Sequence, residues 1–392
     1  MVDFTLTDEQ KDLRELAHSF AEKEMRRVAW EYDKEGTWPQ DIIDKAWEVG
    51  LMNTHIPEAY GGPGLDYLSG CLIEEEMGWG CSGIGTSLMA NGLASAPVTL
   101  GGSEETKKKY LGMLTEAPKL ASFCLTEPDA GSDVSGMKTT ATKKGDKWVI
   151  NGSKCFITNG GYADWFTVYA KTDKDAGHRG ISAFVVPKDD TVTVDKKEDK
   201  LGQRASNTAT ITFSDTEVPE GNLLGEENHG FKLAMMTLDR TRPGVAAMAV
   251  GIARAALEFA ADYSKERVQF GVPIAMHQAV AFMIADMATK VEAARLLTWQ
   301  SGVLLDQGKR NTLAASHAKR FSADSAMEVT TDAVQVYGGY GFIKEYPVEK
   351  LMRDAKIMQI YEGTAQVQRL VIAREVLLPR RIESKEPAGA AA

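Results

Sequence analysis

The hydrophobic and polar positions change period twice along the chain. Up to about residue 120, apolar residues recur at the three- and four-residue spacing of helices, and the first such face carries Leu13, Leu16, Ala17, Phe20 and Ala21. From residue 121 to about residue 226 the spacing shortens to the two-residue alternation of strands. From Gly230 the helical spacing returns. The pattern predicts an α+β chain in which a β part lies between two helical parts.

Residues that start and stop helices and strands refine this division. Thr7 and Gln10 form a capping box at the first helix, and Pro39 suits the first turn of another. Further N-terminal helices are expected over 67–77 and 85–93. The β part should hold strands over 139–142, 148–150, 155–157, 166–170, 181–186 and 208–213, with a tight turn at Asn151-Gly152. Four long helices, over 231–265, 277–306, 312–336 and 365–378, suit an antiparallel bundle.

Three domains and a tail follow from these elements. Residues 1–120 are expected to form an all-α domain, residues 121–226 a β-barrel or β-sandwich domain, and residues 227–380 a four-helix bundle. Residues 381–392 are rich in Ala, Gly and Pro and are expected to be disordered. A chain of 392 residues is long enough for such domains to bury sizeable cores.

Composition removes several classes of function. Hydrophobic residues make up 43% and charged residues 26% of the chain, as in ordinary globular proteins, and the net charge of −10 argues against nucleic acid or an anionic membrane as a general partner. The four cysteines form no CxxC pair and the six histidines no HxxxH or HExxH pair, so no metal site is expected. Structural thiols in a reducing compartment are the simplest interpretation.

The start of the chain shows neither a basic n-region nor an apolar h-region before the Thr7 cap. We therefore expect a cytoplasmic protein, or a mitochondrial matrix protein if a transit peptide was removed. The most apolar helical stretch, residues 245–256, contains Arg254 and is expected to be too short to span a bilayer.

One carboxylate lies between an apolar stretch and the start of a helix. Thr364 is the expected N-cap of the helix over 365–378, which places Glu362 two residues before that helix. Gly363 has no side chain and leaves room for a planar ligand or another backbone. Apolar surroundings disfavour the charged form, so the pKa of Glu362 should rise towards that of a general base. On spacing alone, a solvated glutamate favoured by the helix dipole is the commoner case.

The sequence around this glutamate resembles a known family. The run EYPVEKLMRDAK at 345–356, followed by IYEGTAQ at 360–366, is similar to the C-terminal signature of the acyl-CoA dehydrogenases, and most of all to the medium-chain type. The resemblance extends from about Phe4 to Pro379, and the family shares the order helical, β, helical. It implies that Glu362 removes the α-proton of a fatty acyl-CoA while the β-hydride passes to N5 of FAD.

Two segments of the β part resemble the flavin-binding segments of the family. The first is TEPDAGSD at 126–133, which on composition alone is also a fitting domain linker. The second is FITNGG at 156–161, where Phe156 stands in place of a more usual tryptophan; Phe156 and Ile157 are equally suited to strand core. The Thr158 hydroxyl can bond flavin N5. By resemblance, the flavin contacts are Phe123, Leu125, Thr126, Gly131, Ser132, Phe156 and Thr158.

Two further segments resemble the site for the dinucleotide tail. Arginine suits pyrophosphate because its planar fork donates two hydrogen bonds, although a lone helical arginine is more often solvated or ion-paired. The resemblance implies FAD contacts from Arg267, Gln269, Phe270, His277, Gln278, Thr364 and Gln366, and, from a neighbouring subunit, Gln335, Gly338 and Gly339. FAD would then span two chains, and the protein would be a homotetramer built as a dimer of dimers.

The substrate contacts also follow from the resemblance. Asp239 and Arg242 would meet the adenosine portion of acyl-CoA, and Ser132 would lie near the CoA moiety. Tyr361 and Gly363 flank the base. Position 241, which carries the base in the isovaleryl and long-chain subfamilies, is threonine here, so Glu362 is the only base available.

Met89 takes the place of a glutamate on the floor of the medium-chain acyl pocket. The resemblance along the whole chain implies straight acyl chains of roughly C4 to C12, with medium length preferred, and an apolar, flexible methionine suits a range of lengths. The family implies an electron-transferring flavoprotein as the acceptor. Three other functions fit the sequence: an acyl-CoA oxidase of the same fold, a dehydrogenase for branched acyl-CoA, and a catalytically silent flavin-binding scaffold.

Overall fold

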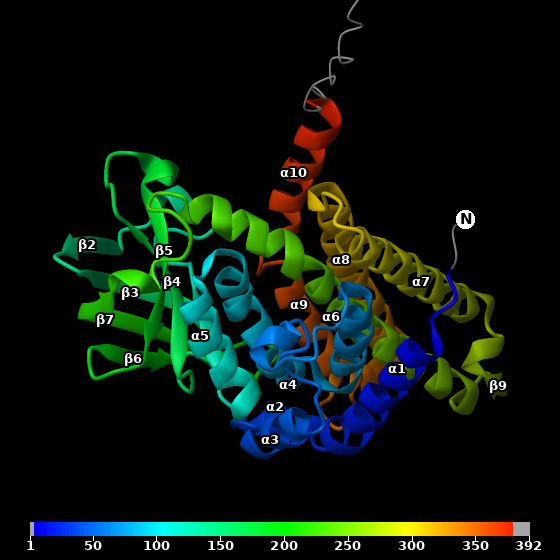
Figure 1. The fold of residues 1–392 in the computed structure, drawn as a ribbon. Helices are drawn as coiled ribbons and strands as arrows, with labels where there is room; N and C mark the ends of the chain where they lie inside the picture. The colour runs from blue at the N-terminus through cyan, green and yellow to red at the C-terminus, as the bar shows by residue number, and fades with distance from the viewer. Residues whose placement is uncertain (1–3, 379–392) are drawn as a thin grey trace, which may run out of the picture.

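The computed structural model describes residues 4–378, in which helices from both ends of the sequence lie together beside a single large sheet (Figure 1). The Thr7 capping box is confirmed, because the Thr7 hydroxyl accepts from Gln10 N and the Gln10 side chain accepts from Thr7 N. The predicted tail over 381–392 lies outside the described residues. The N-terminal helices are α1 (Asp8–Phe20) with a π-helical extension (Ala21–Arg26), α2 (Ala29–Glu35), α3 (Gln40–Glu48), α4 (Tyr67–Gly101) and α5 (Glu104–Glu116).

Helix α4 consists of two helical segments that meet at Cys81. The backbone of Cys81 is extended, with φ −166° and ψ 107°, so the helical hydrogen bonds break there. The helices predicted over 67–77 and 85–93 are these two segments, and each is longer than predicted. Both segments pack against α6 (Gly230–Glu266) and together form two walls of one chamber.

The β part is a seven-stranded sheet in the order β1-β4-β2-β3-β7-β6, with β5 paired to β4. The prediction of a turn at Asn151-Gly152 is wrong. Both residues lie inside the long strand β3, and a bulge between Ile150 and Gly152 absorbs the irregularity. The strands are β1 (Ala121–Cys124), β2 (Thr140–Lys144), β3 (Lys147–Thr158), β4 (Trp165–Lys171), β5 (Ile181–Pro187), β6 (Val192–Lys197) and β7 (Thr208–Pro219).

The C-terminal part contains the four predicted helices and one more. The additional helix is α9 (Val348–Met358), which packs against α6 and α8. A two-stranded hairpin, β8 (Val268–Gln269) and β9 (Val272–Pro273), follows α6. Helix α10 projects away from the body of the molecule (Figure 1). The remaining helices are α7 (Gln278–Asp306), α8 (Thr312–Tyr337) and α10 (Ala365–Leu377).

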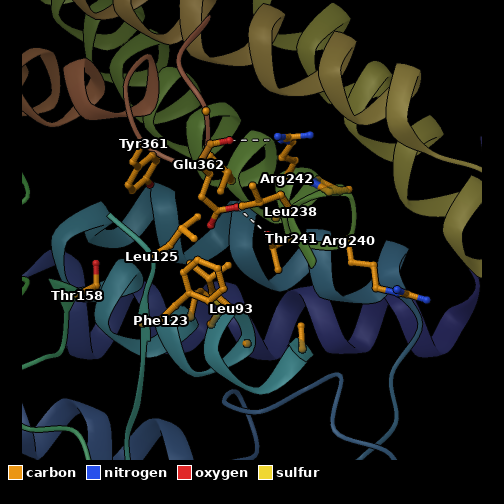
Figure 2. Close-up of a pocket in the computed structure, with 18 of the residues that line it drawn as sticks. Leu93, Phe123, Leu125, Thr158, Leu238, Arg240, Thr241, Arg242, Tyr361 and Glu362 are labelled. Carbon is orange, nitrogen blue, oxygen red and sulfur yellow. Dashed lines mark hydrogen bonds between the residues drawn. The ribbon is translucent and has the colours of Figure 1, made fainter. Parts of the chain in front are cut away.

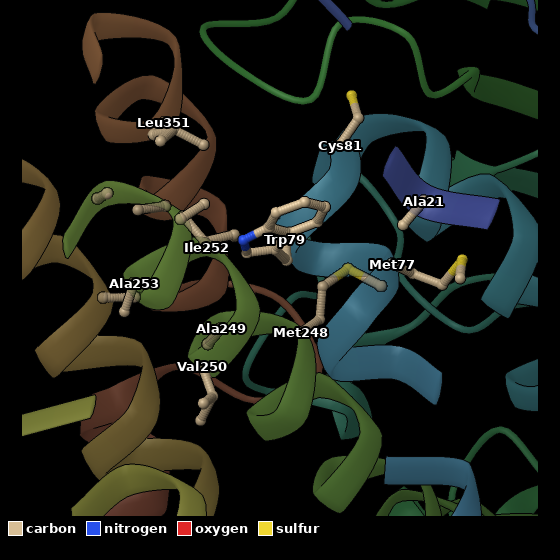
Figure 3. Packing of buried hydrophobic residues seen from close by; sticks show 14 of the residues in the cluster. Ala21, Met77, Trp79, Cys81, Met248, Ala249, Val250, Ile252, Ala253 and Leu351 are labelled. Carbon is tan, nitrogen blue, oxygen red and sulfur yellow. The ribbon is translucent and has the colours of Figure 1, made fainter. Parts of the chain in front are cut away.

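The central core lies along the seam between α4 and α6 (Figure 3). Glycines let the two backbones approach closely. A Cβ at Gly78 would lie 2.3 Å from the Met248 carbonyl oxygen, and a Cβ at Gly251 would lie 2.0 Å from the Glu75 carbonyl oxygen. Trp79, Met248 and Ile252 pack in the same cluster. The seam therefore fixes α4 and α6 relative to each other, and with them the walls of the chamber.

Helix α6 is longer than the sequence suggested. It has 37 residues and a window with a mean hydropathy of 1.5, so its length alone would suffice to cross a bilayer. The expectation of a stretch too short to span, drawn from residues 245–256, is wrong because the helix continues on both sides of them. In the structure 61% of the window is buried inside the protein, against α4, α7 and α8. Its apolar residues are those of a central core helix.

The chain changes from helices to strands, and from strands back to helices, within two short segments. The N-terminal helices end at Glu116 and the strands begin at Ala121. The last strand ends at Pro219 and α6 begins at Gly230. The domain limits predicted at 120 and 226 lie within these intervals.

Candidate active site

A chamber of about 850 Å³ lies between both segments of α4, helix α6, the ends of β1 and β3, and the loop before α10. Its walls are mainly apolar. The chamber brings together most of the predicted flavin and substrate residues: Met89, Phe123, Leu125, Thr126, Gly131, Ser132, Phe156, Thr158, Arg242, Tyr361, Glu362, Gly363 and Thr364. Asp239 and Gln366 do not line it.

The loop before α10 turns the Glu362 side chain into this chamber. Glu362 has φ +52° and Gly363 has φ +91°, both in the left-handed region. Thr364 then caps α10 by accepting a hydrogen bond from Val367 N at 3.1 Å. The Thr241 hydroxyl on α6 donates to Glu362 Oε2 at 2.7 Å, as Figure 2 shows. The carboxylate is therefore fixed from two elements that are far apart in sequence.

Burial raises the pKa of Glu362, as the sequence analysis expected. The Thr241 hydrogen bond, Arg242 and Lys319 act against this rise. Lys319 lies behind the loop, fully buried, and donates to the Gly363 carbonyl oxygen at 2.7 Å. Burial lowers the pKa of Lys319 to about 7. The Glu362 carboxylate thus lies between the apolar chamber on one side and the basic side chains of Arg242 and Lys319 on the other.

Arg242 has neighbours other than those the sequence suggested. It is buried, donates to the Glu362 carbonyl oxygen at 3.3 Å and pairs with Asp239 at 3.0 Å. Both residues were predicted to meet the adenosine of the substrate, and this stays a prediction; in the structure Arg242 bonds the base loop and Asp239 pairs with Arg242. Arg240 also lines the chamber and extends away from Glu362 (Figure 2). Arg240 lies beside Tyr67, which lines the same chamber.

The chamber contains a second carboxyl, that of Glu74, which the sequence did not indicate as a site residue. Glu74, on the first segment of α4, lines the same cavity as Glu362. Burial, followed by the charge of Glu362, raises the pKa of Glu74 to about 8. In the sequence it begins the acidic run Glu74–Glu76, which is typical of a solvated helix face. The signal that distinguishes it is Gly244 on the facing helix, whose missing Cβ makes room for the carboxyl.

The ends of β1 and β3, at the edge of the sheet, form one side of the chamber. Phe123 on β1 and Thr158 at the end of β3 both face it (Figure 2). Phe156 is 64% exposed and has φ +58°, because a second irregularity in β3 turns it out of the sheet. The alternative that Phe156 is strand core is therefore wrong. A Cβ added at Gly131 would meet no atom within 4 Å, so the loop leaves space for a ligand.

The predicted residues for the dinucleotide tail gather elsewhere. A second cavity of about 460 Å³ is lined by Arg267, Gln269, Gly338 and Gly339, and shares no residue with the first. His277 lies beside it, with Nε2 3.2 Å from the Gln269 carbonyl oxygen. Phe270, Gln278 and Gln335 do not line either cavity. One chain thus carries two separate half-sites.

Three family models match this chain in succession. They are the acyl-CoA dehydrogenase N-terminal domain over residues 7–117, the middle domain over 122–216 and the C-terminal domain over 228–377. The chain belongs to the acyl-CoA dehydrogenase family. The resemblance drawn from residues 345–366 and the predicted α+β fold class are confirmed.

Individual relatives agree along nearly the whole chain. "Probable medium-chain specific acyl-CoA dehydrogenase 2, mitochondrial" of Caenorhabditis briggsae is 47% identical over 378 residues, covering 95% of this chain and 92% of the relative. Butyryl-CoA dehydrogenase from Megasphaera elsdenii has a TM-score of 0.94 at 47% identity, covering 96% and 100%. A chain from a structure of the electron transferring flavoprotein of Acidaminococcus fermentans has the same TM-score at 50% identity, also covering 96% and 100%.

The protein is therefore a flavoprotein oxidoreductase, and its cofactor is FAD. The residues of the chamber fit a flavin. The open loop at Gly131, the outward-turned Phe156 and the Thr158 hydroxyl all line the chamber, which is large enough to hold a ring system beside an acyl chain. Phe123 and Leu125 supply the apolar contacts that an aromatic ring needs.

Proposed function

We propose that this dehydrogenase oxidises straight-chain acyl-CoA of short to medium length to trans-2-enoyl-CoA, the first step of fatty acid β-oxidation. The observation that carries the proposal is the Glu362 carboxylate, held by Thr241 at 2.7 Å inside an apolar chamber whose other wall is the flavin-binding edge. Glu362 acts as the base. FAD, when bound, supplies the acceptor for the hydride that leaves the β-carbon.

The charge distribution around Glu362 suits removal of a proton from carbon. Apolar walls exclude water and disfavour the carboxylate, which makes it a stronger base. Behind the loop, Arg242 and Lys319 act against the rise in the pKa of Glu362 and so favour its ionised form. Arg242 and Lys319 also fix the loop through the carbonyl oxygens of Glu362 and Gly363. Both side chains thereby position the base.

The backbone of the same loop suits the thioester carbonyl. Among residues 4–378, no acceptor takes the N–H of Glu362. A free backbone N–H beside the base can donate to the carbonyl oxygen as negative charge develops on it. The base and this donor belong to one residue, so the same loop geometry sets both.

The preferred chain length is part of the proposal. Medium-chain and butyryl-CoA enzymes are both relatives at 47% identity. Met89 lines the chamber, where its flexible apolar side chain suits acyl chains of different lengths. These observations support a range of roughly C4 to C12.

We further propose a homotetramer in which FAD spans two chains and an electron-transferring flavoprotein reoxidises it. The separation of the two half-sites within one chain supports the first part. Helix α10 projects from the body and exposes Leu370, Val376 and Leu377. A helix with exposed leucines is stabilised by a partner surface. The relative from the structure of an electron transferring flavoprotein supports the second part.

Anaerobic titration with octanoyl-CoA tests the function. We expect the visible flavin band of the wild-type protein to bleach, and Glu362→Gln to bleach roughly 10²–10⁴-fold more slowly because the general base is gone. Glu116→Gln, which changes an exposed glutamate at the end of α5, should behave as the wild type. FAD absorbance of each variant before titration reports intact cofactor binding. Equal bleaching of wild type and Glu362→Gln would show that the base lies elsewhere.

A further inference from the structure

Glu74 is a partly buried carboxyl that lines the chamber and that the proposed reaction does not use. It lies on the first segment of α4, where that segment packs against α6. A Cβ at Gly244 would lie 2.0 Å from Glu74 Oε2 and 2.6 Å from Cδ. The glycine therefore admits the carboxyl to the chamber, and a larger residue at this position would displace it.

Glu74 is close to the base along helix α6. Gly244 follows Thr241 by three residues, so the two positions lie on one face of α6, separated by a rise of about 4.5 Å. Thr241 holds the Glu362 carboxylate and Gly244 accommodates the Glu74 carboxyl. The charge of Glu74 also acts on Tyr361, the neighbour of the base. Glu74 thus lines the same chamber as the base, about one turn of α6 away from it.

The Glu74 carboxyl has no hydrogen-bond partner and no ion pair among residues 4–378. Its neighbours in sequence differ, since Glu75 binds Arg295 and Glu76 binds Arg254. A carboxyl in an apolar chamber costs free energy unless a ligand completes its hydrogen bonds. With its pKa raised to about 8, Glu74 is mainly protonated at neutral pH and can both donate and accept.

We propose that Glu74 recognises a hydroxyl group on the acyl chain, beyond the β-carbon, and that the preferred substrates are hydroxylated straight-chain acyl thioesters. The inference rests on the proposed function and specifies its substrate class. A hydroxyl matches because it also both donates and accepts. A methyl group at this place leaves the carboxyl unpaired. A carboxylate there would meet two carboxyl groups, Glu74 and Glu362, and would be disfavoured.

Three thioesters of equal length separate these cases: hexanoyl-CoA, ω-hydroxyhexanoyl-CoA and adipoyl-CoA, which end in a methyl, a hydroxyl and a carboxylate. We measure kcat/KM and the rate of anaerobic flavin bleaching with each. The wild-type holoenzyme should prefer the hydroxyacyl thioester over hexanoyl-CoA by about tenfold or more and should be slowest with adipoyl-CoA. Shorter and longer ω-hydroxyacyl thioesters then locate the hydroxyl along the chain.

Two variants of Glu74 test whether this residue causes the preference for the hydroxyacyl thioester. Glu74→Leu should lose the hydroxyl preference and gain activity with hexanoyl-CoA, whereas Glu74→Gln, which can still donate and accept, should retain the preference. Glu116→Gln, at an exposed glutamate outside the chamber, should also retain it. FAD content and melting temperature identify any variant that fails to fold, and Glu74→Gln keeps the test decisive in that case.

The outcomes distinguish the two proposals. If the wild type bleaches with hexanoyl-CoA but shows no hydroxyl preference, or if Glu74→Leu keeps the wild-type preference, the role of Glu74 is overturned and the dehydrogenase function stands. If no thioester of any length bleaches the FAD-loaded wild type, the proposed function is overturned together with the inference.

Discussion

At the scale of single residues, the hydroxyl of Thr241 is one of the groups that set the pKa of Glu362. Thr241 bonds the Glu362 carboxylate directly, and this bond lowers the pKa of Glu362 against the rise caused by burial. Arg242 and Lys319 act in the same direction from behind the loop. The pH at which the base ionises is therefore set jointly by α6, by α8 and by the chamber.

Replacing Thr241 by valine, which has the same shape but no hydroxyl, tests this. The carboxylate loses a donor that lowers its pKa, so its pKa should rise. The rising limb of the rate of flavin reduction against pH should move to higher pH by the same amount, with the plateau at high pH nearly retained. Thr241→Ser keeps the hydroxyl and should retain the wild-type profile. An unshifted limb in Thr241→Val would contradict the role given to this bond.

A site residue could be predicted from the sequence only where the residues that reveal its role are its neighbours in the sequence. Glu362 was predictable because its motif and its apolar neighbours are local in sequence. Glu74 was not, because only the pairing of α4 with α6 separates it from the ion-paired Glu75 and Glu76. The contacts of Arg242 with Asp239 and with the Glu362 carbonyl oxygen were also not predictable, because they depend on how the loop before α10 packs on α6.

At the scale of elements, periodicity located those helices and strands whose buried face is apolar. It missed α9, whose buried face contains the ion pair of Lys350 and Asp354 at 2.6 Å. It also missed β6, where only Val192 is buried and the other residues are exposed, so no alternation remains. Asn151-Gly152 resembles a hairpin turn locally, but pairing of β3 with β7 on both sides of it keeps the strand continuous.

The seam between α4 and α6 should be the element contact most sensitive to added volume. A Cβ at Gly251 would lie 2.0 Å from the Glu75 carbonyl oxygen and 2.7 Å from Trp79 N, both backbone atoms that cannot move aside alone. Gly251→Ala should therefore lower stability by about 1–3 kcal/mol or more. Urea unfolding followed by far-UV circular dichroism measures this.

Gly112→Ala, in α5, is the matched control. Its nearest atom would be the flexible Glu116 carboxylate at 3.6 Å, so helix propensity should dominate and leave stability unchanged or raised by up to about 1 kcal/mol. Equal unfolding midpoints for Gly251→Ala and the wild type would mean that the seam is looser than the structure shows.

At the scale of the whole molecule, the arrangement of one chain indicates assembly. The chamber of the candidate active site lies beside the sheet, whereas the second cavity adjoins the hairpin of β8 and β9; Figure 1 shows this hairpin at the other end of the molecule. Large apolar side chains are exposed near that hairpin and along α10, including Phe270 at 95% and Leu370 at 71%. Surfaces of this kind are typical of subunit interfaces.

We expect the wild-type protein to sediment at four times its chain mass of 42.7 kDa. Leu370→Glu places a charge on the projecting helix and should shift the protein to smaller species with weaker FAD retention. Leu201→Glu, at a residue of similar exposure far from α10 in sequence, should leave the mass unchanged. Analytical ultracentrifugation with flavin absorbance detects both properties at once. A monomeric wild type that holds FAD fully would rule out a cofactor site shared between chains.

The break in α4 at Cys81 also bears on how this active site can diversify. The first segment carries Glu74 and the second carries Met89, so each presents its own wall to the acyl chain. One residue inserted into a helix turns everything beyond it by about 100°. An insertion in the second segment would bring a new row of side chains to the chamber, while Glu74 and Glu362 stay in place. Small changes of length in one segment can thus produce new acyl selectivities, while the base Glu362 and the loop that holds it stay unchanged.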